Sequence, residues 1–165
     1  MEHLWSPWRM QYINEHQDYE GCVFCVACNG DDCFENLIVK RGQNTFVILN
    51  RYPYNSGHLL VVPYQHCDSL EGLTEEARNE MMALASRSVE ILTQLYHPQG
   101  LNLGINLGTA AGAGIAEHVH MHIVPRWGGD TNFMSVVGQT RVLPEELSET
   151  YRRIQMEWSK VDLSD

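Results

Sequence analysis

Four stretches of the chain have apolar patterns that predict strands. Residues 101–107 alternate between apolar and polar side chains, which is typical of a strand with one buried face. Residues 117–124 alternate in the same way and are followed by Pro125. Residues 45–50 and 58–62 are β-branched and apolar runs, and the segment between them is rich in turn-forming Pro, Asn, Ser and Gly.

Two further stretches follow a helical period. Residues 74–96 begin with Thr74, a capping residue, and two glutamates that favour the first turn of a helix. A second helix is expected from Pro144. The positions expected on the buried faces of the two helices are Met81, Leu84, Ser88, Ile91, Leu92 and Leu95, then Leu147, Tyr151, Ile154 and Trp158. Strands and helices in this order, with short connections, predict an α+β fold around an antiparallel sheet.

The whole chain, residues 1–165, is expected to form one domain. Residues 1–20 are predicted to form an N-terminal arm, and residues 135–165 a C-terminal helical extension. Residues 22–32 contain cysteines, Asn and Gly, and a loop is expected there.

Composition narrows the function classes. The 165 residues are 44% hydrophobic and 19% charged, and no apolar run is long enough for a membrane helix. The N-terminus lacks the apolar core of a signal peptide, so a cytoplasmic location is expected. The net charge of −10 argues against a nucleic-acid surface. A phosphate site would therefore depend on imidazoles, local cations or backbone N–H groups.

The run His118-Val-His120-Met-His122 is the strongest chemical signal. In a strand the three imidazoles share one face, because side chains alternate. A neutral imidazole is a good nucleophile near pH 7, provided that its other ring nitrogen carries a proton held by an acceptor. Alternating histidines also bind zinc in hydrolases. Spacing alone leaves nucleophilic catalysis and metal binding by His118, His120 and His122 equally open.

Five cysteines in a chain without a signal peptide do not predict a disulfide framework. The pair Cys22-Val-Phe-Cys25 indicates metal ligation or redox chemistry instead. Cys28 is a rival third thiolate, and Cys33 and Cys67 are expected to be bystanders.

The histidine run, continued as Ile123-Val-Pro-Arg126, resembles the signature of the histidine triad (HIT) family. Residues 50–63 look like the family's upstream strand pair, and residues 106–114 like its phosphate loop. The likeness extends from about Cys22 to Trp127. The flanks, residues 5–10 and 127–134, are similar to the branch that contains bacterial diadenosine tetraphosphate phosphorylases. The resemblance implies a HIT-like fold with two main helices, and a homodimer whose sheets join across the interface.

The resemblance also implies residue roles. His120 would be the nucleophile, and His122 would bind the α-phosphate or the bridging oxygen. His58 matches an additional histidine near the triad, although packing at a strand start would also explain it. Asn106 matches an amide that contacts the α-phosphate, and Asn50 matches a residue that hydrogen-bonds the ribose hydroxyls, unless it only forms a turn.

The loop before the histidines departs from the family pattern. Many relatives carry a Ser or Thr hydroxyl there, whereas this chain has Gly112-Ala-Gly114-Ile, so backbone N–H groups at Gly112 and Gly114 would cradle a phosphate. Further candidates have equally ordinary explanations as core or surface residues. They are Phe46 and Leu49 for the base, Arg126 and Arg141 for distal phosphates, and Trp127 for stacking.

In some members of the family the cysteine pair is completed by two histidines. His66 lies eight residues after His58, and His118 opens the triad, so the resemblance implies a Cys22, Cys25, His66 and His118 site. A closed Cys₂His₂ site predicts structural zinc, and no organic cofactor is expected.

The expected activity is cleavage at the α-phosphate of an adenine nucleotide or dinucleotide, such as diadenosine tetraphosphate, through a nucleotidyl-His120 intermediate, with phosphorolysis favoured over hydrolysis. Three rivals stay open at this point. One is a hydrolase of nucleoside phosphoramidates or aminoacyl-adenylates. The second is a zinc hydrolase that uses the three triad histidines as ligands, and the third is a nucleotide-binding module without turnover.

Overall fold

The computed structural model describes residues 21–31, 33–130 and 145–162. The predicted N-terminal arm, Arg141 and the first part of the predicted C-terminal extension lie outside these residues. Among the described residues, none of the helices combines the length and the apolar character needed to cross a membrane.

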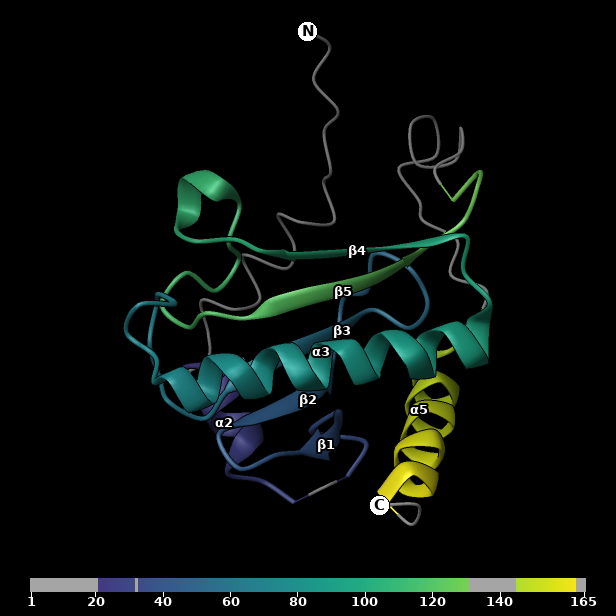
Figure 1. The fold of residues 1–165 in the computed structure, drawn as a ribbon, viewed down its shortest axis with the longest axis horizontal. Helices are drawn as coiled ribbons and strands as arrows, with labels where there is room; N and C mark the ends of the chain where they lie inside the picture. The colour runs from purple at the N-terminus through teal and green to yellow at the C-terminus, as the bar shows by residue number, and fades with distance from the viewer. Residues whose placement is uncertain (1–20, 32, 131–144, 163–165) are drawn as a thin grey trace, which may run out of the picture.

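The strands form one antiparallel sheet of five, in the order β1-β2-β3-β5-β4 (Figure 1). Their bounds are β1 (Ile38–Arg41), β2 (Thr45–Leu49), β3 (Leu59–Pro63), β4 (Gly100–Ile105) and β5 (Met121–Arg126). The register pairs Ile48 with Leu60 and Leu60 with His122, so these three side chains share one face. The α+β fold with an antiparallel sheet is therefore confirmed.

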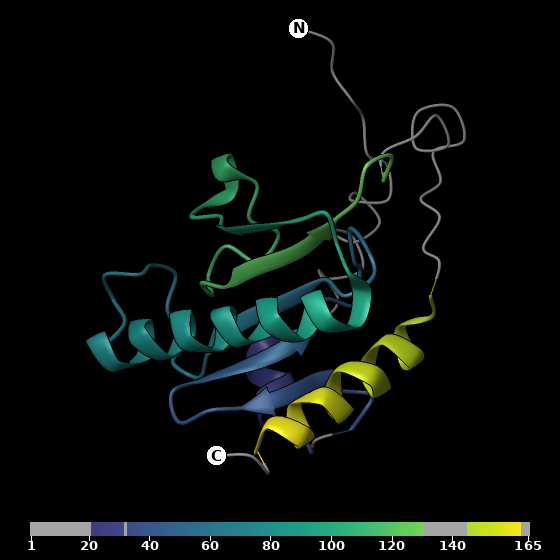
Figure 2. The ribbon, with the colours of Figure 1, turned by 45° about the vertical axis from the view of Figure 1, so that its right-hand side comes forward.

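Two long helices cover the sheet. α3 (Glu75–Tyr96) packs on β2, β3 and β5, and α5 (Leu147–Asp162) packs against α3 and β1 (Figures 1 and 2). The predicted cap is present, because the Thr74 side chain accepts a hydrogen bond from the Ala77 N–H. Of the positions expected on the buried faces, Met81, Ser88, Ile91, Leu92, Tyr151, Ile154 and Trp158 are buried.

The predicted loop at residues 22–32 is wrong, because residues Val23–Cys28 form a short helix, α2. This helix lies on the face of the sheet opposite to α3 (Figures 1 and 2). β1 was also not predicted, since only four residues form it.

The predicted strand at residues 117–124 pairs later than expected. The ladder begins at Met121 and continues through Pro125 to Arg126. The physical reason is a competing partner: the Val119 N–H donates to the Cys67 carbonyl at 2.7 Å rather than to a neighbouring strand. His118 and His120 therefore lie on the segment that leads into β5.

The predicted half-burial of β4 is only partly right. β4 is an edge strand, and Leu103 is 45% exposed, because no described element covers that side chain.

Candidate active site and metal cluster

A cavity of about 430 Å³ lies between α2, the ends of β2 and β3, and the loop that precedes β5. Its apolar part is made by α2 together with residues of β2 and β3. Its polar part contains two of the triad histidines and two glycines. Residues that line the cavity include Val23, Phe24, Val26, Ala27, Leu49, Asn50, Arg51, Tyr54, Gly112, Gly114, Ile115, His120 and His122. Such a slot, lined by both apolar and polar side chains, suits a base and a phosphate.

His120 has one ring nitrogen held and the other available. Its Nδ1 lies 2.8 Å from the His118 carbonyl oxygen, and because a carbonyl can only accept, Nδ1 carries the proton. Nε2 of the neutral ring is left with a lone pair. The imidazole is 4% exposed, and burial lowers the pKa of His120, which keeps it neutral. His120 thus meets the chemical requirement for a nucleophile.

His58 and His122 form a chain of defined direction. The Tyr54 N–H donates to His58 Nδ1 at 3.1 Å, so Nδ1 of the neutral ring carries no proton. His58 Nε2 must then be protonated, and it donates to His122 Nδ1 at 3.0 Å. His122 in turn carries its proton on Nε2. Its ring lies 4.9 Å from the His120 ring, so a donor stands beside the candidate nucleophile.

The structure brings some of the predicted substrate-binding residues to the cavity and leaves another away from it. Asn50 lines the cavity, while its Oδ1 also accepts the Tyr52 N–H at 2.9 Å, so it both forms the turn and faces the slot. Gly112 and Gly114 line the cavity, but the Gly112 N–H already donates to Thr109 within a tight turn. Asn106 follows the last pair of β4 and is not among the residues that line the cavity.

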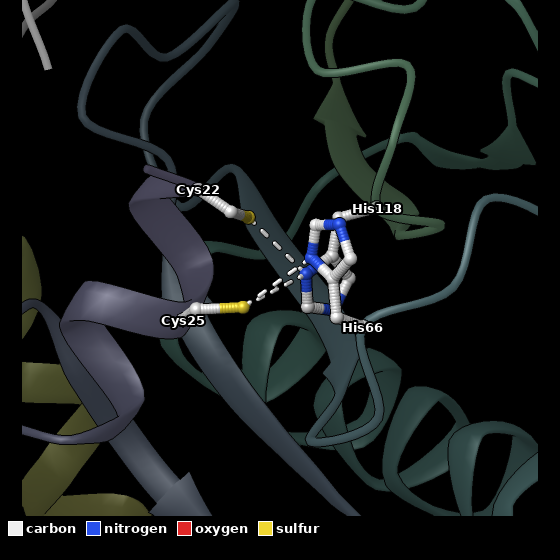
Figure 3. Close-up of side chains that lie close together, drawn as sticks. All are labelled: Cys22, Cys25, His66 and His118. Atoms are coloured by element: carbon white, nitrogen blue, oxygen red, sulfur yellow. Dashed lines mark hydrogen bonds between the residues drawn. The ribbon is translucent and has the colours of Figure 1, made fainter. Parts of the chain in front are cut away.

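The four predicted metal ligands come together. The donor atoms of Cys22, Cys25, His66 and His118 all lie within 4.8 Å of one another. Figure 3 shows the four side chains pointing toward one another. Cys22 Sγ is 3.2 Å from His118 Nδ1, and Cys25 Sγ is 3.4 Å from His66 Nδ1 and 3.7 Å from His118 Nδ1. Tetrahedral zinc with bonds of about 2.3 Å to sulfur and 2.0 Å to nitrogen separates S and N by roughly 3.5 Å. The residues therefore fit a metal ion.

The second ring nitrogen of His118 supports this assignment. His118 Nε2 donates to the Pro63 carbonyl at 2.9 Å, which leaves Nδ1 with a lone pair that faces the thiols. Burial lowers the pKa of His118 and so favours the neutral ligand form. All five cysteines are free thiols, and Cys28, Cys33 and Cys67 lie outside the cluster.

The three-histidine metal site is not what the structure forms. Within the described ranges, the cluster just given is the one group of three or more potential ligands found together, and neither His120 nor His122 belongs to it. His122 Nδ1 is instead occupied by His58.

Several other candidates lie away from the cavity. Arg126 pairs with Asp130 through two nitrogens, at 2.6 and 2.9 Å, and a third nitrogen donates to Asn102, so its charge is already neutralised. The Arg126 guanidinium holds the pKa of Asp130 well below its usual range. Neither Arg126 nor Trp127 lines the cavity, and neither does Phe46, whereas Leu49 does.

The sequence reasoning missed three contributors. Arg51 lines the cavity and donates to the Glu35 carbonyl at 2.7 Å. Among the described residues that line the cavity, it is the one arginine, and there is no lysine. Tyr54 acts through its backbone N–H, for which a sequence carries no signal. Phe24, between the two cysteines, could have been suspected from its place in the motif.

Known proteins resemble this chain in sequence and in fold. The sequence model described as HIT domain matches residues 34–129. A protein of Mycobacterium tuberculosis named AP-4-A phosphorylase is 40% identical over 168 residues, which cover 97% of this chain and 86% of that protein. A zinc-bound histidine triad family protein of Mycobacterium smegmatis has a TM-score of 0.69 at 26% identity, covering 88% of this chain and 98% of that one. The Plasmodium falciparum diadenosine triphosphate hydrolase, 14% identical with a TM-score of 0.60, covers 93% of this chain and 96% of its own, and it shares the fold.

Proposed function

The chain belongs to the HIT domain family, and we propose that it cleaves adenine dinucleotides such as diadenosine tetraphosphate at the α-phosphate, with phosphate as the favoured acceptor. The observation that carries the proposal is the His120 ring, which lines the cavity and whose Nδ1 is tied to the His118 carbonyl, so that Nε2 keeps its lone pair. The sequence identity with a protein named AP-4-A phosphorylase supports the choice of substrate.

The proposed reaction has two displacements at one phosphorus. In the first, His120 Nε2 forms a bond to the α-phosphorus, and the bond from that phosphorus to the bridging oxygen breaks. ATP leaves as the anion, and its leaving oxygen accepts a hydrogen bond from the His122 Nε2–H, which the chain from Tyr54 through His58 places there. The product on the enzyme is a phosphoramidate that joins AMP to His120.

In the second displacement an oxygen of inorganic phosphate attacks the same phosphorus. The phosphorus–nitrogen bond breaks, the electron pair returns to His120 Nε2, and ADP leaves. The proton of the incoming phosphate leaves on the β-phosphate of ADP, His122 keeps its own proton throughout, and His120 regains its starting form. Water in place of phosphate would release AMP instead.

The metal cluster supports this chemistry from outside the cavity. Cys22, Cys25, His66 and His118 would hold zinc, which would supply structural cross-linking rather than a reactive ligand position, because four protein donors close the site. His118 belongs to the cluster, and its carbonyl accepts a hydrogen bond from His120 Nδ1–H. Fixing His118 therefore fixes the orientation of the nucleophile.

A homodimer is part of the proposal. β4 is a sheet edge, and Leu103 and Leu107, in and just after it, are each 45% exposed. An open edge with apolar side chains is a ready template for pairing with a second strand. Antiparallel pairing of two β4 strands would join two sheets and cover these leucines. Light scattering of the purified protein tests this, and a monomer at all concentrations would contradict it.

Product analysis tests the activity. The protein is incubated with diadenosine tetraphosphate, with and without inorganic phosphate, and the nucleotides are identified by mass spectrometry. We expect ADP and ATP when phosphate is present. If AMP and ATP form whether or not phosphate is present, the enzyme is a hydrolase rather than a phosphorylase. Absence of turnover in both reactions would refute the dinucleotide proposal and favour a phosphoramidate or an aminoacyl-adenylate as substrate.

A further inference from the structure

The short helix α2 belongs to both sites at once. Cys22 directly precedes the first helical residue and Cys25 lies within the helix, so two of the four metal ligands come from this segment. Four of its residues, Val23, Phe24, Val26 and Ala27, line the cavity. One turn and a half of helix is thus the wall that separates the metal cluster from the proposed nucleotide slot.

Phe24 is the side chain that touches both sites. It is 4% exposed. Its ring centre lies 5.4 Å from that of His118, a metal-cluster residue, in an edge-on arrangement at 78°. The same ring lies 5.0 Å from His120, the proposed nucleophile, tilted by 54°. A shift of α2 would therefore move the ring that packs on the nucleophile and lines the slot.

Few interactions within α2 stabilise this helix. A six-residue helix is far below the length at which helices are stable in isolation. Cys22 makes no side-chain capping hydrogen bond, and the first turn has no acidic residue. At the other end, Arg41 donates to the Cys28 and Gly30 carbonyls at 2.9 Å each. The thiol–imidazole cluster ties the start of the helix to His118 and His66 (Figure 3).

We infer that metal binding by Cys22, Cys25, His66 and His118 controls nucleotide affinity, with Phe24 as the positioning residue that couples the two sites. The inference rests on the proposed function, because it takes the cavity as the nucleotide site. Cys22 and Cys25, held to a metal ion together with the two histidines, would fix α2 as a wall of the slot. Without the ion the wall loosens, and a nucleotide must order it at a cost in affinity.

Coupling of this kind is reciprocal, which gives two independent measurements. The first is the dissociation constant of AMP, by calorimetry, for zinc-loaded and chelator-treated protein whose fold is checked by circular dichroism. We expect weaker binding without zinc, by roughly 5- to 150-fold. The second is transfer of zinc from the protein to a chromogenic chelator. AMP should raise the apparent zinc affinity by the same factor.

Paired variants separate the coupling from general damage. Cys25→Ser should bind AMP as weakly as the zinc-free protein, whereas Cys28→Ser, on the same helix but outside the cluster, should keep both zinc and AMP affinity. Phe24→Ala should retain one zinc per chain, bind AMP more weakly, and lose the effect of AMP on zinc release. Phe34→Ala removes an aromatic ring that packs on Tyr151 outside the cavity, and its coupling should be unchanged.

The possible results distinguish failure of the coupling from failure of the proposed function. Equal AMP affinity with and without zinc, in protein that remains folded, would overturn the coupling and leave the proposed function intact. An apparent zinc affinity of the wild-type protein that AMP does not change would also overturn the coupling and leave the proposed function intact. If zinc-free protein unfolds, the chelator-transfer experiment and the Phe24→Ala variant still decide the matter, because both begin from loaded protein. Zinc-loaded protein that binds no AMP at all would refute the proposed function and the coupling together.

Discussion

His118 and His120 lie two residues apart, are both buried, and present opposite nitrogens to their surroundings. In His118 the Pro63 carbonyl holds Nε2, and Nδ1 faces two thiols. In His120 the carbonyl of His118 holds Nδ1, and Nε2 is left for the cavity. The backbone acceptor near each ring thus decides which lone pair is offered, and with it whether the ring suits a metal cluster or an attack on phosphorus.

The two regions also differ in what surrounds them. The metal cluster gathers donors from α2, from the segment after β3 and from the segment before β5, and it includes the exposed His66. His120 lies against an apolar wall, beside a histidine chain that begins at a backbone N–H. We propose that the first region cross-links the chain through a metal ion and that the second region reacts.

The largest effect is expected at His120. His120→Asn removes the proposed nucleophile, so turnover of diadenosine tetraphosphate should fall by about 10⁴-fold or more. Zinc content by elemental analysis should stay at the wild-type value, since His120 is not in the cluster. Loss of zinc together with activity would mean that the two regions are not separate.

The next effect is expected in the histidine chain. His58→Gln removes the imidazole that fixes the protonated nitrogen of His122, and losing one well-placed donor to a developing oxyanion typically costs about 10²- to 10³-fold in kcat. We expect the loss in kcat rather than in KM, together with an altered pH–rate profile. A change confined to KM would indicate that His58 only shapes the cavity.

A smaller effect on chemistry, but a large one on stability, is expected at the metal cluster. Cys22→Ser should release the metal and lower the melting temperature by roughly 6–12 °C, the shift that follows from losing about 3 kcal/mol in a chain of this size. Calorimetry with and without added zinc measures it. A zinc-independent melting temperature in the wild-type protein would contradict a structural metal.

The smallest effect is expected at Asp130, which belongs to neither region. Its lowered pKa means that the ion pair with Arg126 stabilises the fold above the unfolded-state pKa of about 3.9 and that this stability is lost as pH falls below that value. Asp130→Asn should lower the melting temperature by about 3 °C at pH 7 and by less at pH 3. Activity of this variant should match the wild type. A constant difference across pH would show that the charge is not responsible.

The residues of the site could be found from the sequence to different degrees. Alternation placed His118, His120 and His122 on one face, and the family resemblance supplied Cys22, Cys25 and His66, which the structure brings together with His118. Which nitrogen each ring offers could not be predicted, because it depends on where the carbonyls of Pro63 and His118 end up after folding.

The fold was predictable where periodicity is long and not where contacts decide. The 22-residue helix α3 and the paired strands β2 and β3 follow their patterns. α2 escaped prediction because six residues between cysteines carry little helical signal, and its position depends on distant histidines. Arg51 and Tyr54 reach the site through a turn whose side chains and amides have no periodic pattern.

The central claim is that His120 Nε2 carries the nucleotide during turnover. The direct test is to mix the protein with diadenosine tetraphosphate without phosphate, quench within milliseconds, and map the modified residue by mass spectrometry under conditions that preserve phosphoramidates. We expect one AMP group on the peptide that contains His120, removed as ADP when phosphate is added before the quench. An AMP group on another residue, or turnover with no covalent adduct at any time, would contradict the account.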